Sequence, residues 1–353
     1  RETGGDEAAE GGVVGRVEHH HRLDPVEAGA AALVALERQA PGRGEGGRVA
    51  GGGSTVVMAG TGIQTIDTTG AAFTRTDVFG RARMAVDPAL RFTLTGSAYR
   101  NRERGRAFTE TGLQHVSVED EAIAGGASAQ WVVTPRTTLE ARAYATSFDE
   151  SSANSPDTLH ESLSKADLTL TRAFGERQLL QVGIEASVNE YGGRNRLRDE
   201  TGHQAETAVI WAQDRINLGS RVALTLGGRY DRHSIFGSAL SPKAALNARV
   251  TDALRLRASY GEGFRAPDLG QLFYRFVPTA GVYQVVGNPD LGPESSESWQ
   301  AGADYTPSSR MRLGFNLFHN EVDNLIEAVS LGFLTSPMQR AALLAREGID
   351  PSF

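Results

Sequence analysis

Apolar and polar residues alternate one by one over long stretches of the chain from about residue 55 onward. Such alternation places apolar side chains on one face of a β-strand and polar side chains on the other. The pattern predicts about twelve strands between Ala72 and Val322, with one more candidate strand over Thr55–Ile66. The clearest examples are Leu90–Thr95, Leu180–Asn189, Arg221–Tyr230, Leu254–Tyr260 and Met311–Leu317.

The length of the predicted strands points to a membrane. They run to about 10 to 13 residues, whereas strands in water-soluble proteins mostly have about 5 or 6. A strand that crosses a bilayer at a tilt needs about 9 to 11 residues. We therefore expect strands that span a bilayer.

Short and long connections alternate along the chain. Outer-membrane barrels have short turns on the periplasmic side and long loops outside the cell. The sequence thus predicts an all-β fold, an antiparallel up-and-down transmembrane β-barrel, of which this chain supplies about 12 to 13 strands. The predicted tight turns are 86–89, 134–136, 174–177, 218–220, 251–253 and 306–308, and the long links are 101–121, 149–160, 191–204 and 264–294.

In such a barrel, Leu224, Leu256, Leu313 and Phe315 are expected to face outward. Several aromatic residues also lie near predicted strand ends, where transmembrane barrels carry aromatic girdles. The alternative is ordinary packing of aromatic pairs across neighbouring strands. These residues are Tyr99, Trp131, Phe148, Phe174, Tyr230, Tyr260, Trp299 and Tyr305.

Composition narrows the function classes. Hydrophobic residues make up 40% and charged residues 22%, which fits a soluble protein and equally a barrel with a polar lumen. The absence of cysteine excludes disulfides and cysteine-ligated metals. The net charge of -7 gives no support to a nucleic-acid partner.

The apolar run Ala28–Leu36 is too short to span a membrane as a helix, and the acidic Asp24 and Glu27 before it do not suit a signal peptide.

We do not expect an enzyme. An outer-membrane hydrolase needs a nucleophile with a nearby histidine. His160, His203, His233 and His319 are scattered, and no Gly-x-Ser-x-Gly turn precedes a helix. Three adjacent histidines, His19–His21, are interpreted as incidental, so neither a metal site nor a cofactor is predicted.

The chain divides into three parts. Residues 1–53 are rich in Gly and Ala and end in a glycine-rich run typical of a flexible linker, and we leave them unassigned. Residues 54–330 are the predicted barrel portion. Residues 331–353 lack alternation and are interpreted as a truncated extracellular loop, with a short helix over Ala341–Arg346.

Three ordered sequence elements lie between Ala258 and Ile326. The first is a Gly-Phe-Arg-Ala-Pro run followed by Leu-Phe, the second is Asn-Pro-Asp-Leu-x-Pro-Glu, and the third ends in Asn-Leu-Ile. Their residues are Gly263, Phe264, Arg265, Ala266, Pro267, Leu272 and Phe273; Asn288, Pro289, Asp290, Leu291, Pro293 and Glu294; and Asn320, Asp323, Asn324, Leu325 and Ile326.

Each element has a physical interpretation. Arg265 can donate to several acceptors at once through its planar fork, and Pro267 ends strand pairing because it lacks an N–H. Asn288, Pro289 and Asp290 favour a turn, and Glu294 is placed to pair with an arginine of a neighbouring strand. We favour a rim that stops strands and orders loops over direct ligand contact.

Together the three elements resemble the C-terminal half of the barrel in TonB-dependent outer-membrane receptors. The resemblance implies active import of a scarce nutrient, either a ferric siderophore or a corrinoid such as cobalamin, across the bacterial outer membrane. It also implies three partners: outer-membrane lipid, a small-molecule chelate, and the inner-membrane TonB complex. A passive porin-like or structural barrel explains the alternation equally well, but not the three elements.

The chain also departs from this family. Its members carry an N-terminal plug domain and a segment that touches the energy-transducing partner, and residues 1–53 resemble neither, although they are a candidate plug remnant. Plugged transporters have about 22 strands, roughly twice the number predicted here. We therefore expect a chain that is cut at both ends, and a sheet that does not close.

The loop over 274–283 is the candidate ligand contact. Its aromatic side chains supply rigid contact area, and an arginine suits anionic or chelate ligands. The alternative is that these residues pack the loop on its neighbours. The candidates are Tyr274, Arg275, Phe276 and Tyr283.

Overall fold

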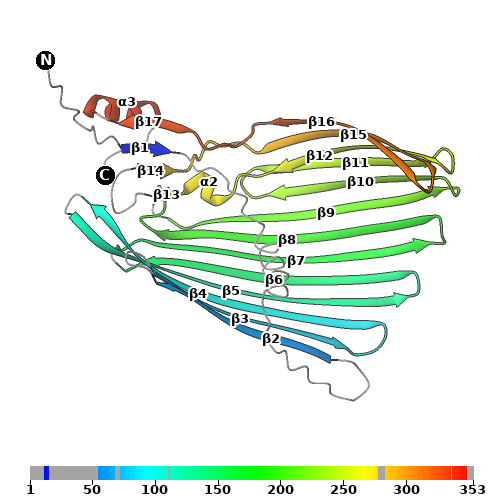
Figure 1. The fold of residues 1–353 in the computed structure, drawn as a ribbon, viewed down its shortest axis with the longest axis horizontal. Coiled ribbons are helices and arrows are strands. Elements are labelled where there is room, and N and C mark those ends of the chain that lie inside the picture. Colours follow the sequence, from blue (N-terminus) through cyan, green and yellow to red (C-terminus); the bar gives the residue numbers. More distant parts are fainter. Residues whose placement is uncertain are drawn as a thin grey trace.

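In a computed structural model of the chain, the described residues are 12–15, 55–67, 72–109, 112–153, 155–199, 201–276, 283–334 and 336–347. Most of them form one 13-stranded sheet, in which each strand pairs antiparallel with the sheet strands that precede and follow it along the chain (Figure 1). The sheet confirms the predicted strands between Ala72 and Val322 and the candidate strand that precedes them. Its strands are β2 (Thr55–Asp67), β3 (Ala72–Ala85), β4 (Leu90–Thr109), β5 (Gly112–Thr134), β6 (Thr137–Ser152), β7 (Thr158–Phe174), β8 (Gln178–Arg194), β9 (His203–Leu218), β10 (Val222–His233), β11 (Gly237–Arg249), β12 (Leu254–Arg265), β15 (Glu294–Ser308) and β16 (Met311–Asp323).

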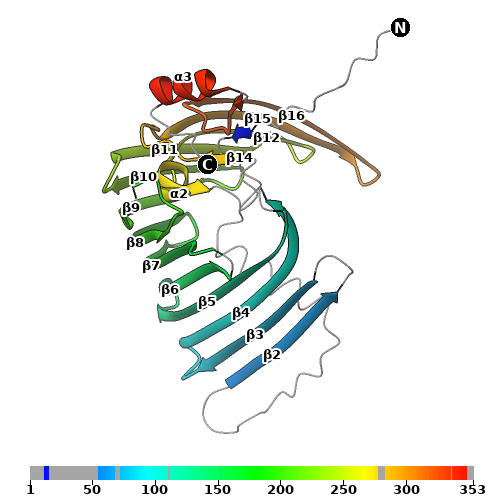
Figure 2. The same cartoon turned by 90° about the vertical axis from the view of Figure 1, so that its left-hand side faces the viewer.

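The sheet curls into an arc and does not close, as Figure 2 shows. Its edges are β2 and β16, which pair on one side only. The all-β, up-and-down architecture and the open sheet agree with the predicted incomplete barrel.

The strands are longer than predicted at one end. They run from 12 residues in β10 to 23 residues in β5. The expected long link over 101–121 is wrong, because β4 and β5 continue through it as a paired ribbon up to Thr109 and Gly112. Polar residues can extend a ladder beyond the bilayer because strand pairing uses the backbone and does not require apolar side chains.

The turns at the opposite end are as short as predicted. The turn between β7 and β8 contains Gly175 and that between β9 and β10 contains Gly219, with φ of 66° and 75° respectively. This left-handed backbone favours glycine, which has no Cβ to clash. We call this end the turn end and the other the loop end.

The two faces of the sheet differ in polarity, as the alternation predicts. Helix α2 (Leu269–Phe273) lies inside the arc in Figure 2 and packs on Leu159 and Tyr191, which marks their face as concave. The opposite, convex face carries exposed apolar side chains, including Leu256 at 42%, Leu313 at 51% and Phe315 at 66% exposure. Leu224 shares this face, opposite Leu246, so all four residues expected to face outward do so.

The apolar band on the convex face ends at charged residues near the loop end. On β4 it runs from Leu90 to Ala98 and stops at Arg100, which pairs with Glu119 and Glu121. Within the band, Asp214 accepts a hydrogen bond of 2.6 Å from Gln178. Ten of the strands carry an ionisable residue on the convex face beyond this band, which we call a boundary residue. These are Arg100, Glu121, Asp149, His160, Glu190, Glu206, Arg232, Glu262, Glu297 and Glu321.

The predicted aromatic girdle is correct in part. Tyr230, Tyr260 and Trp299 lie on the convex face just below the boundary residues, and Trp131, Phe174 and Tyr305 lie on it near the turn end. Tyr99 and Phe148 are exceptions. Both point to the concave face, where Arg75 stacks over the Tyr99 ring and Phe148 packs on the buried cluster.

A second sheet, which is separate from the main one, has four strands: β1 (Gly12–Gly15), β13 (Arg275–Phe276), β14 (Tyr283–Val286) and β17 (Ser330–Leu334). Helix α3 (Pro337–Glu347) contains the predicted helix over Ala341–Arg346. The rest of the 1–53 segment, including His19–His21, lies outside the described residues. Neither helix is long and apolar enough to cross a membrane, within the part of the chain that the structure describes.

The two faces should respond differently to the same substitution. Leu168 and Thr169 are neighbours on β7, but Leu168 lies on the convex face and Thr169 on the concave face. Because the convex face is predicted to contact hydrocarbon, Leu168→Arg should destabilise the protein in lipid vesicles by about 2–4 kcal/mol. Thr169→Arg, the matched control, should cost far less. Denaturant unfolding of the full-length protein in vesicles measures both, and equal losses would contradict the assignment of faces.

Candidate functional site

The first sequence element ends β12 and starts α2. Beyond Arg265 and Pro267, the Asp268 carboxylate accepts a hydrogen bond of 2.7 Å from the Gln271 N–H, and the Gln271 side chain accepts one of 3.0 Å from the Asp268 N–H. This capping box satisfies two donors that a helix start leaves unpaired. Strand β12 therefore ends at Arg265, as Pro267 predicts, and a short helix begins four residues later.

Arg265 and Glu294 join the first two sequence elements. They stand opposite each other on β12 and β15, and Arg265 Nη1 lies 2.6 Å from Glu294 Oε2. The predicted pairing of Glu294 with an arginine is confirmed. The other oxygen, Glu294 Oε1, accepts a hydrogen bond of 2.7 Å from the N–H of Ile326. One buried carboxylate thus ties together all three sequence elements.

The turn over 288–290 is also present and is tied to α2. The N–H of Asn288 donates to the carbonyl of Gln271 at 2.8 Å, and its side-chain oxygen accepts from the N–H of Asp290 at 3.2 Å. Gly287 lies so close to α2 that a Cβ there would sit 2.7 Å from the Gln271 carbonyl oxygen. Only glycine permits this approach.

The third element has a left-handed residue. Asn324 has a φ of 56°, a conformation that asparagine tolerates better than most residues. Its side-chain amide donates to the Pro293 carbonyl at 3.4 Å. Asn324 therefore turns the chain out of β16 and back toward the second element.

A loop that the sequence analysis did not connect to these elements packs against them. The connection between β8 and β9, residues 195–202, carries Leu197, which is fully buried in a cluster with Leu159, Tyr191, Leu269 and Leu272. A lone apolar residue in the polar run RNRLRDE was the only signal of this role. The cluster is the hydrophobic core of the loop end.

Backbone hydrogen bonds hold the same loop to the α2 region. The N–H of Arg275 donates to the Arg196 carbonyl and the N–H of Arg198 donates to the Phe273 carbonyl, both at 2.9 Å. The Arg198 side chain donates to the Gly287 carbonyl at 2.9 Å. The two loops therefore form one unit.

Charged side chains of this loop are anchored as well. Arg196 is buried, forms an ion pair of 2.5 Å with Glu150, and stacks over the Phe276 ring at 4.5 Å. His203 stacks flat on Phe273 with ring centroids 3.5 Å apart and lies 3.0 Å from Asp199. Partial burial opposes ionisation of Asp199, but hydrogen bonds from His203 and Thr201 outweigh it and hold the pKa of its carboxyl below the usual value.

The four candidate ligand contacts fall in this unit. Tyr274 and Phe276 stack with ring centroids 6.3 Å apart, and Arg275 stands opposite Val286 in the pairing of β13 with β14. Tyr283 begins β14. The segment 277–282 between them lies outside the described residues, so the ligand-contact assignment stays a prediction.

Residues 151–340, more than half of the chain, match the model of the TonB-dependent receptor-like β-barrel. The chain belongs to this family. Membership confirms the resemblance carried by the three elements and places the chain in the bacterial outer membrane.

Curated relatives share part of the barrel. The chain is 28% identical to an iron-regulated outer membrane virulence protein of Vibrio cholerae, over 46% of the chain and 25% of the relative. It is 26% identical to a ferric enterobactin receptor of Pseudomonas aeruginosa, over 48% of the chain and 26% of the relative. The match thus spans about a quarter of each of these relatives.

Solved structures agree with the fold. The siderophore receptor PirA from Pseudomonas aeruginosa superposes with a TM-score of 0.60 at 19% identity, covering 78% of this chain and 53% of that one. The copper transporter OprC superposes with a TM-score of 0.58 at 13% identity, covering 79% and 53%. At such identities the likeness concerns the fold alone.

Glu294 should be the residue on which the loop end of this receptor barrel depends most. Glu294→Ala removes the acceptor of the Ile326 N–H and the partner of Arg265, which should cost about 1–3 kcal/mol of local stability. Hydrogen exchange of the full-length receptor should then show faster exchange at Ile326 and in α2. Glu297→Ala, an exposed boundary residue three positions further along β15, is the control. Equal protection in both variants would argue against a central role for Glu294.

Proposed function

We propose that this barrel belongs to a receptor that imports a ferric siderophore with energy supplied by the TonB complex of the inner membrane. The observation that carries the proposal is the set of contacts at the loop end in which one carboxylate, Glu294, binds both Arg265 and the Ile326 N–H and so joins the three family elements. Relatives whose names refer to iron regulation and ferric enterobactin support a siderophore over a corrinoid. A passive porin-like barrel remains the second candidate, favoured only by the polar concave face.

The loop end is the proposed extracellular side. Its ordered loops, anchored through Leu197 and Arg196, would present a firm surface to a ligand arriving from outside. We keep the division of the chain into 1–53, a barrel portion over 54–330, and an extracellular loop over 331–353. Helix α3 would then lie outside the cell, and contact with TonB would be made by a part of the receptor other than this barrel.

Transport by the receptor has a direct test. A strain that lacks the gene for the full-length receptor should lose uptake of radioactive iron supplied as a ferric catecholate siderophore, and the cloned gene should restore it. Uptake should also vanish in cells without functional TonB. Restored uptake that persists without TonB would favour the passive barrel, and restored uptake of labelled cobalamin instead of iron would favour a corrinoid.

The proposed ligand contact has a separate test. Among the described residues, Arg196 and Arg265 are held in ion pairs, whereas none involves the Arg275 guanidinium. Its planar guanidinium group would therefore be able to bind an anionic chelate. Replacing Arg275 and Tyr283 by Ala should weaken binding of the siderophore about tenfold, as loss of a contact worth more than about 1 kcal/mol would. Arg310→Ala, at the turn end, is the control. Unchanged affinity at normal surface levels would leave the loop a structural role.

A further inference from the structure

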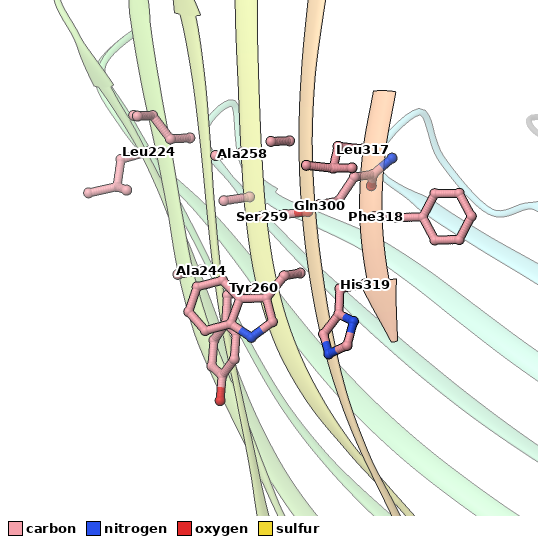
Figure 3. A pocket seen from close by; sticks show the side chains of 13 residues that line it. Leu224, Ala244, Ala258, Ser259, Tyr260, Gln300, Leu317, Phe318 and His319 are labelled. Atoms are coloured by element: carbon pink, nitrogen blue, oxygen red, sulfur yellow. The ribbon is translucent and has the colours of Figure 1, made fainter. Parts of the chain in front are cut away.

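The lipid-facing side of the barrel carries a groove near the loop end (Figure 3). It lies over β10, β11, β12, β15 and β16 and has a volume of about 360 Å³. Sites for small molecules span about 300–1,000 Å³. A groove of this size on a face that contacts hydrocarbon has room for part of a lipid.

Small residues form the floor of the groove. In one cross-strand row, Leu246, Ala258, Ala301 and Leu317 are paired neighbours on β11, β12, β15 and β16. The two alanines lie between two leucines, so the surface is lower in the middle of the row than at its ends. The walls and floor are aliphatic, which suits an acyl chain.

An aromatic pair closes the groove toward the loop end. The rings of Tyr260 and Trp299 lie 4.3 Å apart. The Trp299 Nε1–H donates to Glu297 at 2.6 Å, and the Tyr260 hydroxyl donates to Glu262. Their polar edges are therefore satisfied by boundary residues, and their apolar surface is left for the groove.

The surface just beyond the aromatic pair, toward the loop end, is acidic. Glu262, Glu297 and Glu321 are direct cross-strand neighbours. His319 lies 3.9 Å from Glu321, and the outward-facing positions of β12, β15 and β16 carry no arginine or lysine. Adjacent like charges repel one another, so a cation here would be stabilised. A headgroup that carries only a phosphate would be repelled.

We infer that this groove holds one acyl chain of a lipid whose headgroup carries an amine. The alanine floor seats the chain, the aromatic pair marks the level of the headgroup, and the carboxylates attract the ammonium group. Because Ala258 and Ala301 lie four residues below Glu262 and Glu297, the chain belongs to the leaflet on the loop side. The inference depends on the membrane face and not on which nutrient is transported.

The test uses the full-length receptor, purified in mild detergent with palmitoyl-oleoyl phosphatidylethanolamine, and native mass spectrometry to measure retained lipid. Ala301→Leu fills the floor and should lower the retained fraction about tenfold. Ala186→Leu is the matched control, since Ala186 faces outward on β8 four residues below Glu190 and lines no part of the groove. It should retain the lipid as the natural receptor does.

A second arm tests the headgroup. Phosphatidylglycerol with the same acyl chains lacks the amine and should be retained about tenfold less than phosphatidylethanolamine. Equal retention of the two lipids would overturn the inference, as would equal retention by Ala301→Leu and the natural receptor, or equal losses in Ala301→Leu and Ala186→Leu. Normal heat-resistant migration of each variant in gels shows that it has folded.

Discussion

A backbone N–H or C=O group inside a bilayer has no water to bond with, so it must find its partner within the protein. In this chain each strand from β3 to β15 of the large sheet meets the requirement by pairing with its two neighbours in the sequence. That ladder leaves each side chain only two directions, toward the convex face or toward the concave face. The one-by-one alternation of apolar and polar residues is the consequence of this pairing.

A single sheet that forms the wall of a barrel in this way encloses no hydrophobic core between its two faces. Its apolar side chains, such as Leu256 and Phe315, are exposed on the convex face. Among the described residues, the buried apolar side chains gather instead at the loop end, around Leu197 and Leu272. The loops, unlike the strands, are therefore held in place by a packed apolar cluster and by buried polar side chains such as Glu294. A binding surface on such loops benefits because less conformational entropy is lost when a ligand binds.

Much of the wall could be predicted from the sequence because alternation is a local property. Twelve strands and the outward direction of Leu313 follow from a few neighbouring residues. An arginine partner for Glu294 on a neighbouring strand could be expected from the sequence, but the structure was needed to identify it as Arg265. The sequence predicts a loop where the β4–β5 ribbon lies because its polar residues resemble loop residues, although strand pairing does not depend on side-chain polarity. The sequence also predicts Phe148 in the girdle because it lies near a strand end, but the alternation of side chains along β6 turns it to the concave face.

The loop end was harder to predict because its contacts join residues far apart in the sequence. Arg196 pairs with Glu150, and Leu197 packs on Leu272. No periodic pattern connects such positions, since each loop has its own irregular path. The lone apolar Leu197 indicated burial but not the partner, which depends on how the wall curls.

The alternation also limits how such a sequence can change in evolution. A single residue inserted within β8 would turn every following side chain of that strand to the opposite face, moving Ile184 or Val188 into the lumen. Insertions and deletions within strands are therefore disfavoured, while those in loops are tolerated. A single exchange needs only to keep the polarity of its face. Barrels can accordingly diverge to 19% identity and still superpose, as this chain does with a siderophore receptor.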